Sequence, residues 1–299
     1  MLRDFRLLVA EGFLYINRCI SICMYFIPSP PPSPVGRGGY DANTDATINS
    51  KDPFLNMMTT TMRYLICLLS LILFSFSAQA GLLKSGFDAT FNVYVSGIYA
   101  GVSSRHLTRH GKLIEYRSQT VASGLASLFV SDIVTEVSQA RYEDKNIVSL
   151  SYRYQQTGGK DKVDESVTFD WDKKKLHISH NNKTYPIQPH SYDILSFQLA
   201  LMQILSSSPK KFVFHVADYH DLHTYDATLA GKETIDTEYG ELGTWRVDAI
   251  NRENGNRFTF WCAPKLDYLP VRVKFERADT GMGSMTELKS LQLRGTNKH

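Results

Sequence analysis

Cysteine is scarce in this chain, with only four among 299 residues. Cys19, Cys23 and Cys67 all precede position 80, so Cys262 is the one cysteine beyond it. A segment with a single cysteine cannot form an internal disulfide. Beyond position 80 the fold must therefore be held together by an apolar core, and the segment is long enough to bury one.

An excess of charge of either sign is missing as well. Lysine and arginine together number 33 against 30 aspartates and glutamates, which gives a formal net charge of +3. The basic residues are scattered, and Lys173–Lys175 and Lys210–Lys211 are the only short clusters. Scattered charge is typical of a solvated surface. The composition therefore argues against nucleic acid as a partner.

Motifs that specify catalysis are also lacking beyond position 80. Serines are plentiful, but none stands in the Gly-x-Ser-x-Gly arrangement of a nucleophile elbow. The segment Gly281–Gly283 could suggest a phosphate-binding loop, yet it lacks the helix and the lysine that such a loop requires. We therefore expect a hairpin turn there.

Two pairs of carboxylates and one thiol remain as candidate catalytic groups. Asp164 with Glu165, or Asp236 with Glu238, could serve as the acid pair of a glycosidase. On alternating strands, however, such residues usually belong to the solvated face. Cys262 lies in an apolar strand, where a free cysteine usually acts as a small hydrophobe. We therefore predict no catalytic residue and no cofactor.

Histidines and acids gather in one segment of the chain. His215, His220 and His223, with Asp218 and Asp221, superficially resemble a metal site. Their spacing fits no familiar metal motif. With a turn expected at residues 220–221, these side chains need not converge. We therefore predict no metal site.

A stretch rich in apolar residues, Leu65–Phe76, follows closely after Met62. It is shorter than the roughly 20 residues that a membrane-spanning helix needs. Ala78 and Ala80 supply small residues at the two positions that signal peptidase reads. We predict a signal peptide over residues 62–80 with cleavage between Ala80 and Gly81, a periplasmic location, and no transmembrane segment in the mature chain.

Residues 1–61 precede this predicted signal peptide. They contain a proline-rich patch over Pro28–Pro34 and show no sustained periodicity. We interpret them as a disordered upstream extension that arises from a start codon assigned too early. A genuine long leader is the alternative. Residues 81–299 are then predicted to form a single β-rich domain.

Strict alternation of apolar and polar residues begins at Phe87–Val95, which is typical of a half-buried strand. Most of the remaining chain is divided by turn-forming residues into short segments of this kind. The predicted strands are Tyr99–Thr108, Lys112–Ala122, Asp132–Tyr142, Ile147–Gln156, Val163–Trp171, Leu176–His180, Phe212–Tyr219, Thr224–Leu229, Thr244–Asn251, Arg257–Cys262, Val271–Arg277 and Met285–Leu293. Short turns between them indicate antiparallel pairing.

One segment changes to helical spacing of its apolar residues, Ile194–Leu205, with Ser191 or Asp193 as a possible N-cap and Pro209 beyond its end. The overall prediction is a mostly β fold. We expect a large curved antiparallel sheet that forms a barrel or half-barrel, with one amphipathic helix whose apolar face packs on the concave side.

Three strings, Tyr192–Gln198, Lys232–Ile235 and above all Trp261–Arg272, together resemble the family of exported bacterial proteins catalogued as domain of unknown function 3108. The resemblance implies an envelope protein with a β-rich fold, and it supplies no catalytic residues. We expect its motif positions to be structural, with Arg272 able to pair with Asp267. These positions are Asp193, Ser196, Glu233, Trp261, Pro264, Asp267, Tyr268, Pro270 and Arg272.

The aromatic content suggests that the curled sheet encloses a cavity for an apolar ligand. Our leading hypothesis is a non-enzymatic periplasmic binding or carrier protein for an apolar or lipid-like small molecule. Two alternatives remain open. One is a structural or assembly factor that binds another envelope protein. The other is a hydrolase whose site is assembled from distant residues.

Overall fold

The computed structural model describes residues 81–294 except 145, 160–161 and 208. The predicted upstream extension and signal peptide therefore lie outside the described residues. The elements in chain order are α3 (Leu82–Ser85), β1 (Phe87–Val95), β2 (Ile98–His110), β3 (Leu113–Ala122), η1 (Gly124–Leu128), β4 (Ile133–Glu143), β5 (Asn146–Thr157), β6 (Val163–Asp170), β7 (Lys175–Ile178), β8 (Lys183–Pro186), β9 (Ser191–Asp193), α4 (Ser196–Ser206), β10 (Lys211–Ala217), β11 (Leu222–Thr237), β12 (Gly240–Asn251), β13 (Arg257–Ala263), η2 (Pro264–Leu266), β14 (Leu269–Glu276) and β15 (Gly283–Leu293).

All of these strands belong to one 15-stranded sheet, with the order β8-β7-β6-β5-β4-β3-β2-β1-β15-β14-β13-β12-β11-β10-β9. Neighbouring strands are antiparallel except for β9 and β10, which are parallel. The first and last strands, β1 and β15, pair in the middle of the sheet. The two edges are β8 and β9, which are consecutive in the chain.

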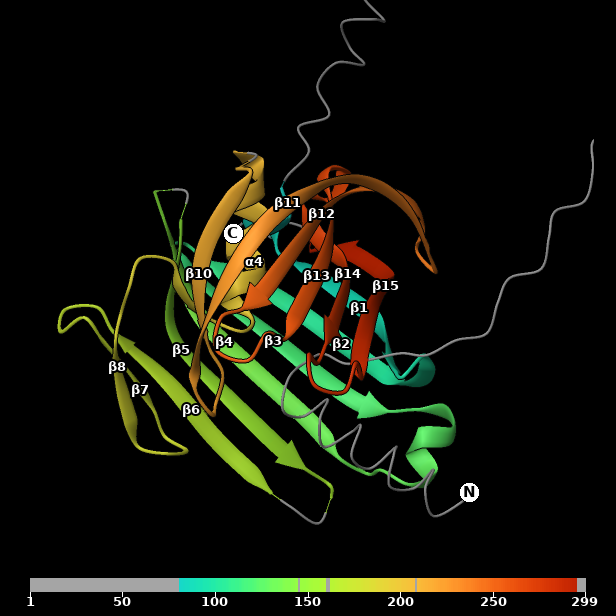
Figure 1. The fold of residues 1–299 in the computed structure, drawn as a ribbon, viewed down its shortest axis with the longest axis horizontal. Helices are drawn as coiled ribbons and strands as arrows, with labels where there is room; N and C mark the ends of the chain where they lie inside the picture. The colour runs from blue at the N-terminus through green and yellow to red at the C-terminus, as the bar shows by residue number, and fades with distance from the viewer. Residues whose placement is uncertain (1–80, 145, 160–161, 208, 295–299) are drawn as a thin grey trace, which may run out of the picture. The chain divides into compact units, whose positions relative to one another are not determined.

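The sheet curls strongly around α4, as Figure 1 shows. Its two edge strands do not pair with each other, so the curl is an incompletely closed barrel in the part of the chain that the structure describes. The predicted mostly β fold with a large curved antiparallel sheet is thereby confirmed. In the long β11–β12 hairpin a bulge at Gly231, with φ 147°, interrupts the regular register.

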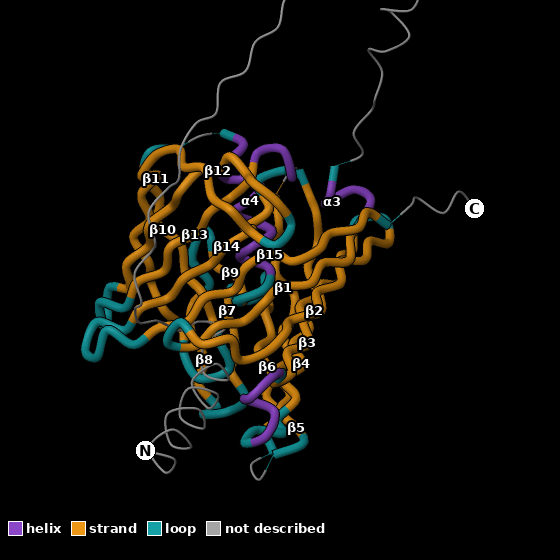
Figure 2. The backbone as a smooth tube through the Cα atoms, turned by 90° about the vertical axis from the view of Figure 1, so that its right-hand side faces the viewer, coloured by secondary structure: helices purple, strands orange, loops and turns teal. Residues whose placement is uncertain are grey.

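Helix α4 lies inside the curl and is the helix that the apolar spacing predicts. It contacts β4 and β5 in one half of the sheet and β14 and β9 in the other. Figure 2 shows it between β10 to β14 on one side and β1 to β5 on the other. Most of its residues are buried, including Phe197, Leu201 and Leu205. The apolar face therefore packs on the concave side, as predicted.

Several predicted boundaries are wrong. Strand β11 continues through the bulge to Thr237 instead of ending at Leu229, and β7 ends at Ile178 instead of His180. The short edge strands β8 and β9 were not predicted, because neither is long enough to show alternation. Helix α3 was not predicted either. Within the described residues, neither helix has the length and apolar character that crossing a bilayer requires.

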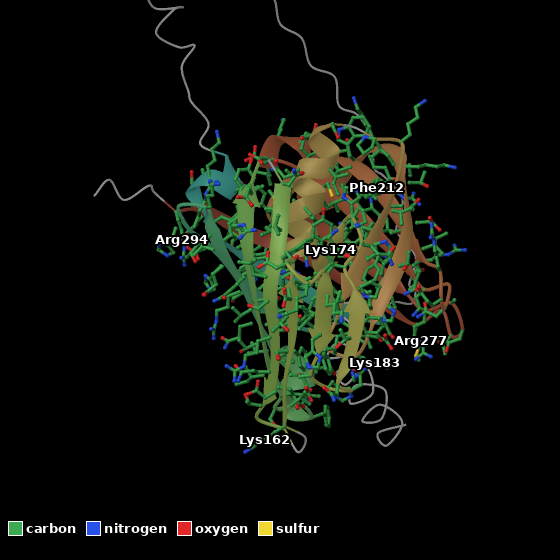
Figure 3. All side chains as sticks on the ribbon, turned by 90° about the vertical axis from the view of Figure 1, so that its left-hand side faces the viewer. Lys162, Lys174, Lys183, Phe212, Arg277 and Arg294 are labelled. Carbon is green, nitrogen blue, oxygen red and sulfur yellow. The ribbon has the colours of Figure 1, made fainter. Side chains whose placement is uncertain are left out.

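Side chains, and not a backbone ladder, join the β8 end of the sheet to the β10–β11 turn. Lys183 of β8 forms an ion pair with Asp221 at 2.9 Å, and Tyr185 donates a hydrogen bond to the same carboxylate. The rings of Tyr154 and Tyr219 stack with centroids 4.1 Å apart. Figure 3 views this side of the molecule, with Lys183 labelled. We call the gap between the unpaired edge strands β8 and β9 the open seam. These contacts hold its lower part together.

Candidate functional site

The concave face over β10 to β14 is lined with aromatic side chains that pack on the start of α4. The ring of Phe197 stacks on Phe214 with centroids 4.0 Å apart, and Phe214 stacks on Tyr225 at 5.2 Å. Between these rings lies a cavity of about 40 Å³, which also touches Gln198 and Phe260. We call it the aromatic pocket. It is almost wholly apolar and has room for no more than a few water molecules.

A histidine–carboxylate pair stands at the edge of the aromatic pocket. Nε2 of His223 lies 3.5 Å from Oδ2 of Asp218. Burial lowers the pKa of His223, but the bond to Asp218 and the negative charges of Asp218, Asp221 and Glu253 together raise it overall. Asp218 also accepts hydrogen bonds from the backbone N–H groups of His220 and Asp221, which closes the β10–β11 turn. No serine, threonine or cysteine lines this pocket among the described residues.

A larger cavity of about 310 Å³ lies along the second half of α4, at the upper part of the open seam. Its walls come from Ala200 and Ile204 of the helix, Tyr192 of β9, and Phe212 of β10, which is labelled in Figure 3. We call it the seam groove. The ring of Phe212 is 6.0 Å from that of Phe214 in the aromatic pocket. Phe212 and Phe214, which follow each other on one face of β10, thus lie between the two cavities.

A buried arginine lies beside the aromatic pocket, on the opposite half of the sheet. Arg105 of β2 is 1% exposed. Its Nη1 donates a hydrogen bond of 2.8 Å to Oε1 of Gln198, and its guanidinium carbon lies 4.1 Å from the centre of the Phe91 ring. The Nε and Nη2 atoms have no hydrogen-bond acceptor in the described part of the chain. Such unpartnered buried donors mark the cluster as a candidate binding position.

A buried glutamate faces the same interior from β4. Glu136 is 2% exposed and accepts a hydrogen bond of 2.7 Å from the hydroxyl of Tyr152 through Oε1. Its Oε2 has no partner among the described residues. Burial raises the pKa of Glu136 to about 7, although the bond from Tyr152 and the charge of Arg105 oppose the increase. The group therefore changes its charge near neutral pH.

Asp193 and Ser196 organise the start of α4. The carboxylate of Asp193 accepts hydrogen bonds from the backbone N–H groups of Leu195 and Ser196, both at 2.9 Å. It also accepts from the hydroxyls of Ser196 at 2.6 Å and Ser138 at 2.8 Å. Ser196 in turn contacts the hydroxyl of Ser149 on β5 at 2.6 Å. Burial raises the pKa of Asp193, while these bonds oppose the increase.

A second group of motif residues lies away from the helix, over β11 to β15. Glu233 accepts a hydrogen bond of 2.6 Å from the indole of Trp261 and one of 2.9 Å from Arg246. Arg272 pairs with the carboxylate of Glu287 and donates to the backbone oxygen of Asp236 at 2.6 Å. These motif positions therefore form a surface network apart from the start of α4.

The expected pair between Arg272 and Asp267 is wrong. Asp267 adopts the left-handed conformation, with φ 51°, in the turn after η2. Its carboxylate accepts a hydrogen bond of 2.5 Å from the backbone N–H of Leu82. Pro264 begins this turn, and Tyr268 closes it by donating from its backbone N–H to the oxygen of Ala263 at 2.8 Å. The corner thus anchors α3 instead of binding Arg272.

Pro270 and Cys262 occupy opposite positions where β13 and β14 pair. The thiol of Cys262 is fully buried, and burial raises its pKa, so the reactive thiolate form is disfavoured. Three of the four acids in the candidate pairs have side-chain partners of their own. Asp164 binds Arg153, Glu165 binds Ser179 and His180, and Glu238 binds Asn92 and Lys289.

The histidine segment does not assemble into a metal centre. His215 contacts the hydroxyl of Thr224 at 3.1 Å, His223 contacts Asp218, and Asp221 binds Lys183. Residues 81–294, as far as they are described, contain no group of three or more histidine, cysteine or acidic side chains placed to hold a metal ion.

Sequence reasoning missed Arg105, Glu136 and Gln198. An arginine or glutamate in an alternating strand suggests the solvated face, whereas these two lie on the concave face. The register shows why: Arg105 stands opposite Ser118, and Ser118 stands opposite Glu136 on the next strand. Ser118 thus separates the two charged residues across the sheet. Only the cross-strand pairing shows that Arg105 and Glu136 share one face of the sheet.

Comparisons with known proteins add a family and two distant folds. A family model described as "Protein of unknown function (DUF3108)" matches residues 39–288, a range that includes the predicted signal peptide. No curated protein matches the chain. A β-barrel-like protein of domain of unknown function DUF1849 from Brucella abortus is similar at 9% identity and TM-score 0.47, covering 70% of this chain and 98% of its own. MucB is similar at 10% identity and TM-score 0.32, covering 72% and 55%. Likenesses at this level carry no argument about function.

Proposed function

We propose a function from the geometry of the concave face. The chain belongs to DUF3108, a family described as "Protein of unknown function", so membership of the family supplies no activity. The proposal is a non-enzymatic binding or carrier protein that acts in the periplasm and holds an apolar or lipid-like ligand along α4. The observation that carries it is the seam groove, whose volume of about 310 Å³ falls in the range of small-molecule sites.

The character of the cavity walls supports an apolar ligand. Beside polar side chains such as Gln203, the seam groove presents Ile204 and Phe212. The aromatic pocket continues with Phe197, nearer the start of α4, and with Phe214 on the strand of Phe212. Aromatic side chains give large apolar contact area at low conformational cost. Because the aromatic pocket is narrow, a long ligand would enter it only if these side chains rotate. The open seam supplies a route that requires no strand ladder to break.

Filling the seam groove is the direct test. We expect Ile204→Trp to weaken binding of the fluorescent apolar probe N-phenyl-1-naphthylamine by about 10-fold or more, because the indole would occupy the space that the probe needs. Ser206→Trp is the matched control, since Ser206 is exposed on the same helix and does not line the groove. Fluorescence titration gives both dissociation constants.

Mass spectrometry of organic extracts from the protein purified out of the periplasm would identify the natural ligand. Wild-type protein that is ligand-free and also fails to bind the probe would contradict the proposed function. That outcome would favour an assembly factor instead, for which Leu125 and Leu128 of η1, 66% and 73% exposed, offer an apolar contact surface.

The periplasmic location rests on the predicted signal peptide, and contacts near Gly81 support the cleavage position. Directly after that residue, Leu82 and Leu83 are buried, and Asp267 accepts a hydrogen bond from the backbone N–H of Leu82. We expect the exported protein to start at Gly81, because cleavage there releases α3 with its contacts intact. N-terminal sequencing of protein from a periplasmic extract measures this. Recovery of residues before Met62, or retention of all the protein in the cytoplasm, would contradict it.

A further inference from the structure

Several arginines of this chain bind carboxylates through the pair of atoms Nε and Nη2. Arg153 donates from these atoms to the two oxygens of Asp164 at 2.7 and 2.6 Å. Arg252 binds Asp226 in the same way at 2.8 and 2.6 Å. The planar guanidinium presents two parallel N–H donors that match the two oxygens of a carboxylate.

In Arg105 the same two atoms, Nε and Nη2, have no acceptor among the described residues. Unlike Arg153 and Arg252, Arg105 is buried. Its other side is fixed, because Nη1 donates to Gln198 and the guanidinium lies on the face of Phe91. The free Nε and Nη2 donors are therefore held in a defined position inside the protein. A buried charge without a partner costs several kcal/mol of folding free energy. Such an arrangement indicates that its acceptor is supplied from outside the chain.

Glu136 is the internal acid that could compete for Arg105. It does not bind Arg105 in the structure. Its Oε1 accepts a hydrogen bond from Tyr152, and its Oε2 has no hydrogen-bond partner among the described residues. The two residues stand on β2 and β4, with Ser118 of β3 between them. Two strand spacings separate their backbones by roughly 10 Å. Glu136 thus leaves the Nε and Nη2 donors of Arg105 without an acceptor.

We propose that Nε and Nη2 of Arg105 bind the anionic head group of the ligand, a carboxylate on an otherwise apolar chain. This inference rests on the proposed function, since the apolar part would lie along α4. Gln198 connects the two regions: it lines the aromatic pocket and accepts the hydrogen bond from Arg105. The ligand is then an acidic amphiphile that enters with its head group toward β2. A phosphate monoester offers the same pair of oxygens on a larger, more highly charged group.

Binding of three matched compounds distinguishes these possibilities. Calorimetry would measure the dissociation constants of dodecanoic acid, dodecyl phosphate and methyl dodecanoate for the wild-type protein, Arg105→Met and Arg153→Met. We expect the wild type to bind the acid at least about 10-fold more tightly than the ester, because a charged bidentate hydrogen bond contributes that much. Arg105→Met should remove this advantage and leave ester binding unchanged. Arg153→Met, which removes an exposed arginine of the same kind, should change neither.

The outcomes separate this inference from the proposed function. Equal affinity of wild-type protein for acid and ester overturns the role of Arg105 while the carrier function stands, and this comparison needs no variant to fold. An acid preference that survives in Arg105→Met overturns it as well. Tighter binding of dodecyl phosphate than of dodecanoic acid, lost in Arg105→Met, keeps Arg105 as the anion site and assigns the ligand to phosphate esters. If wild-type protein binds none of the three compounds, the proposed function itself is wrong.

Discussion

Replacing Asp193 by alanine is expected to lower the free energy of unfolding by about 4 kcal/mol. The carboxylate is fully buried and accepts hydrogen bonds from the backbone N–H groups of Leu195 and Ser196 at the start of α4. The substitution leaves both donors without an acceptor in the interior, where each unsatisfied group costs about 1–3 kcal/mol. It also removes the acceptor for the hydroxyls of Ser196 and Ser138. Equilibrium unfolding in urea measures the loss.

Asp193→Asn is the matched variant. Its amide oxygen can still accept from the two backbone N–H groups, and the neighbouring hydroxyls can rotate to accept from its amide nitrogen. We therefore expect a much smaller loss than for the alanine variant. Equal destabilisation by the two substitutions would show that the negative charge, and not the hydrogen-bonded cap, stabilises the start of the helix.

The free energy of unfolding is expected to fall as the pH rises from 5 to 8, and Glu136 is a main cause. Burial raises its pKa from 4.5 to about 7, so the folded state holds a proton that the unfolded state has already released. The stabilising effect of this proton is complete below pH 4.5 and is lost as the pH rises through the folded pKa. The difference between the two pKa values corresponds to roughly 3 kcal/mol.

Glu136→Gln isolates this contribution, because glutamine keeps an acceptor for Tyr152 and has no carboxylate to ionise. The variant should match the wild type near pH 5 and be more stable at pH 8. Part of the wild-type slope should remain, since burial also raises the pKa of Asp193. Glu115→Gln, which removes an exposed carboxylate from β3, is the control. Parallel stability curves for wild type and Glu136→Gln would contradict the assignment of the pH dependence to Glu136.

Local pattern predicts the parts of this fold that depend on neighbouring residues alone. Strand β1 has the predicted bounds, Phe87–Val95, because one of its faces packs on the core throughout. The prediction of Ser191 or Asp193 as the N-cap is wrong, because the N-cap residue of α4 is Leu195. Asp193 still binds the N–H groups of Leu195 and Ser196, as a short polar side chain near a helix start can. Strand β9 could not be predicted, since its three residues are extended only by parallel pairing with β10.

The candidate site was harder to predict than the fold. Arg105 is part of an alternating segment in which an arginine indicates the exposed face, and its burial results from β1, β3 and α4 packing around it. The predicted partner of Arg272, Asp267, was wrong for a related reason. The left-handed turn at Asp267 directs that carboxylate toward Leu82, far away in the sequence, and leaves Arg272 to Glu287 on the adjacent strand.

The pairing of β1 with β15 has a consequence for connectivity. Every other ladder in the sheet joins strands that are consecutive in the chain, so each half of the sheet can form as a meander from local contacts. The β1–β15 ladder alone, which places Phe87 opposite Leu293, requires the two halves to meet. Because local pairing precedes distant pairing, we expect this ladder to form last. A circularly permuted chain, joined between residues 294 and 81 and opened between β8 and β9, would keep every ladder and make this one local.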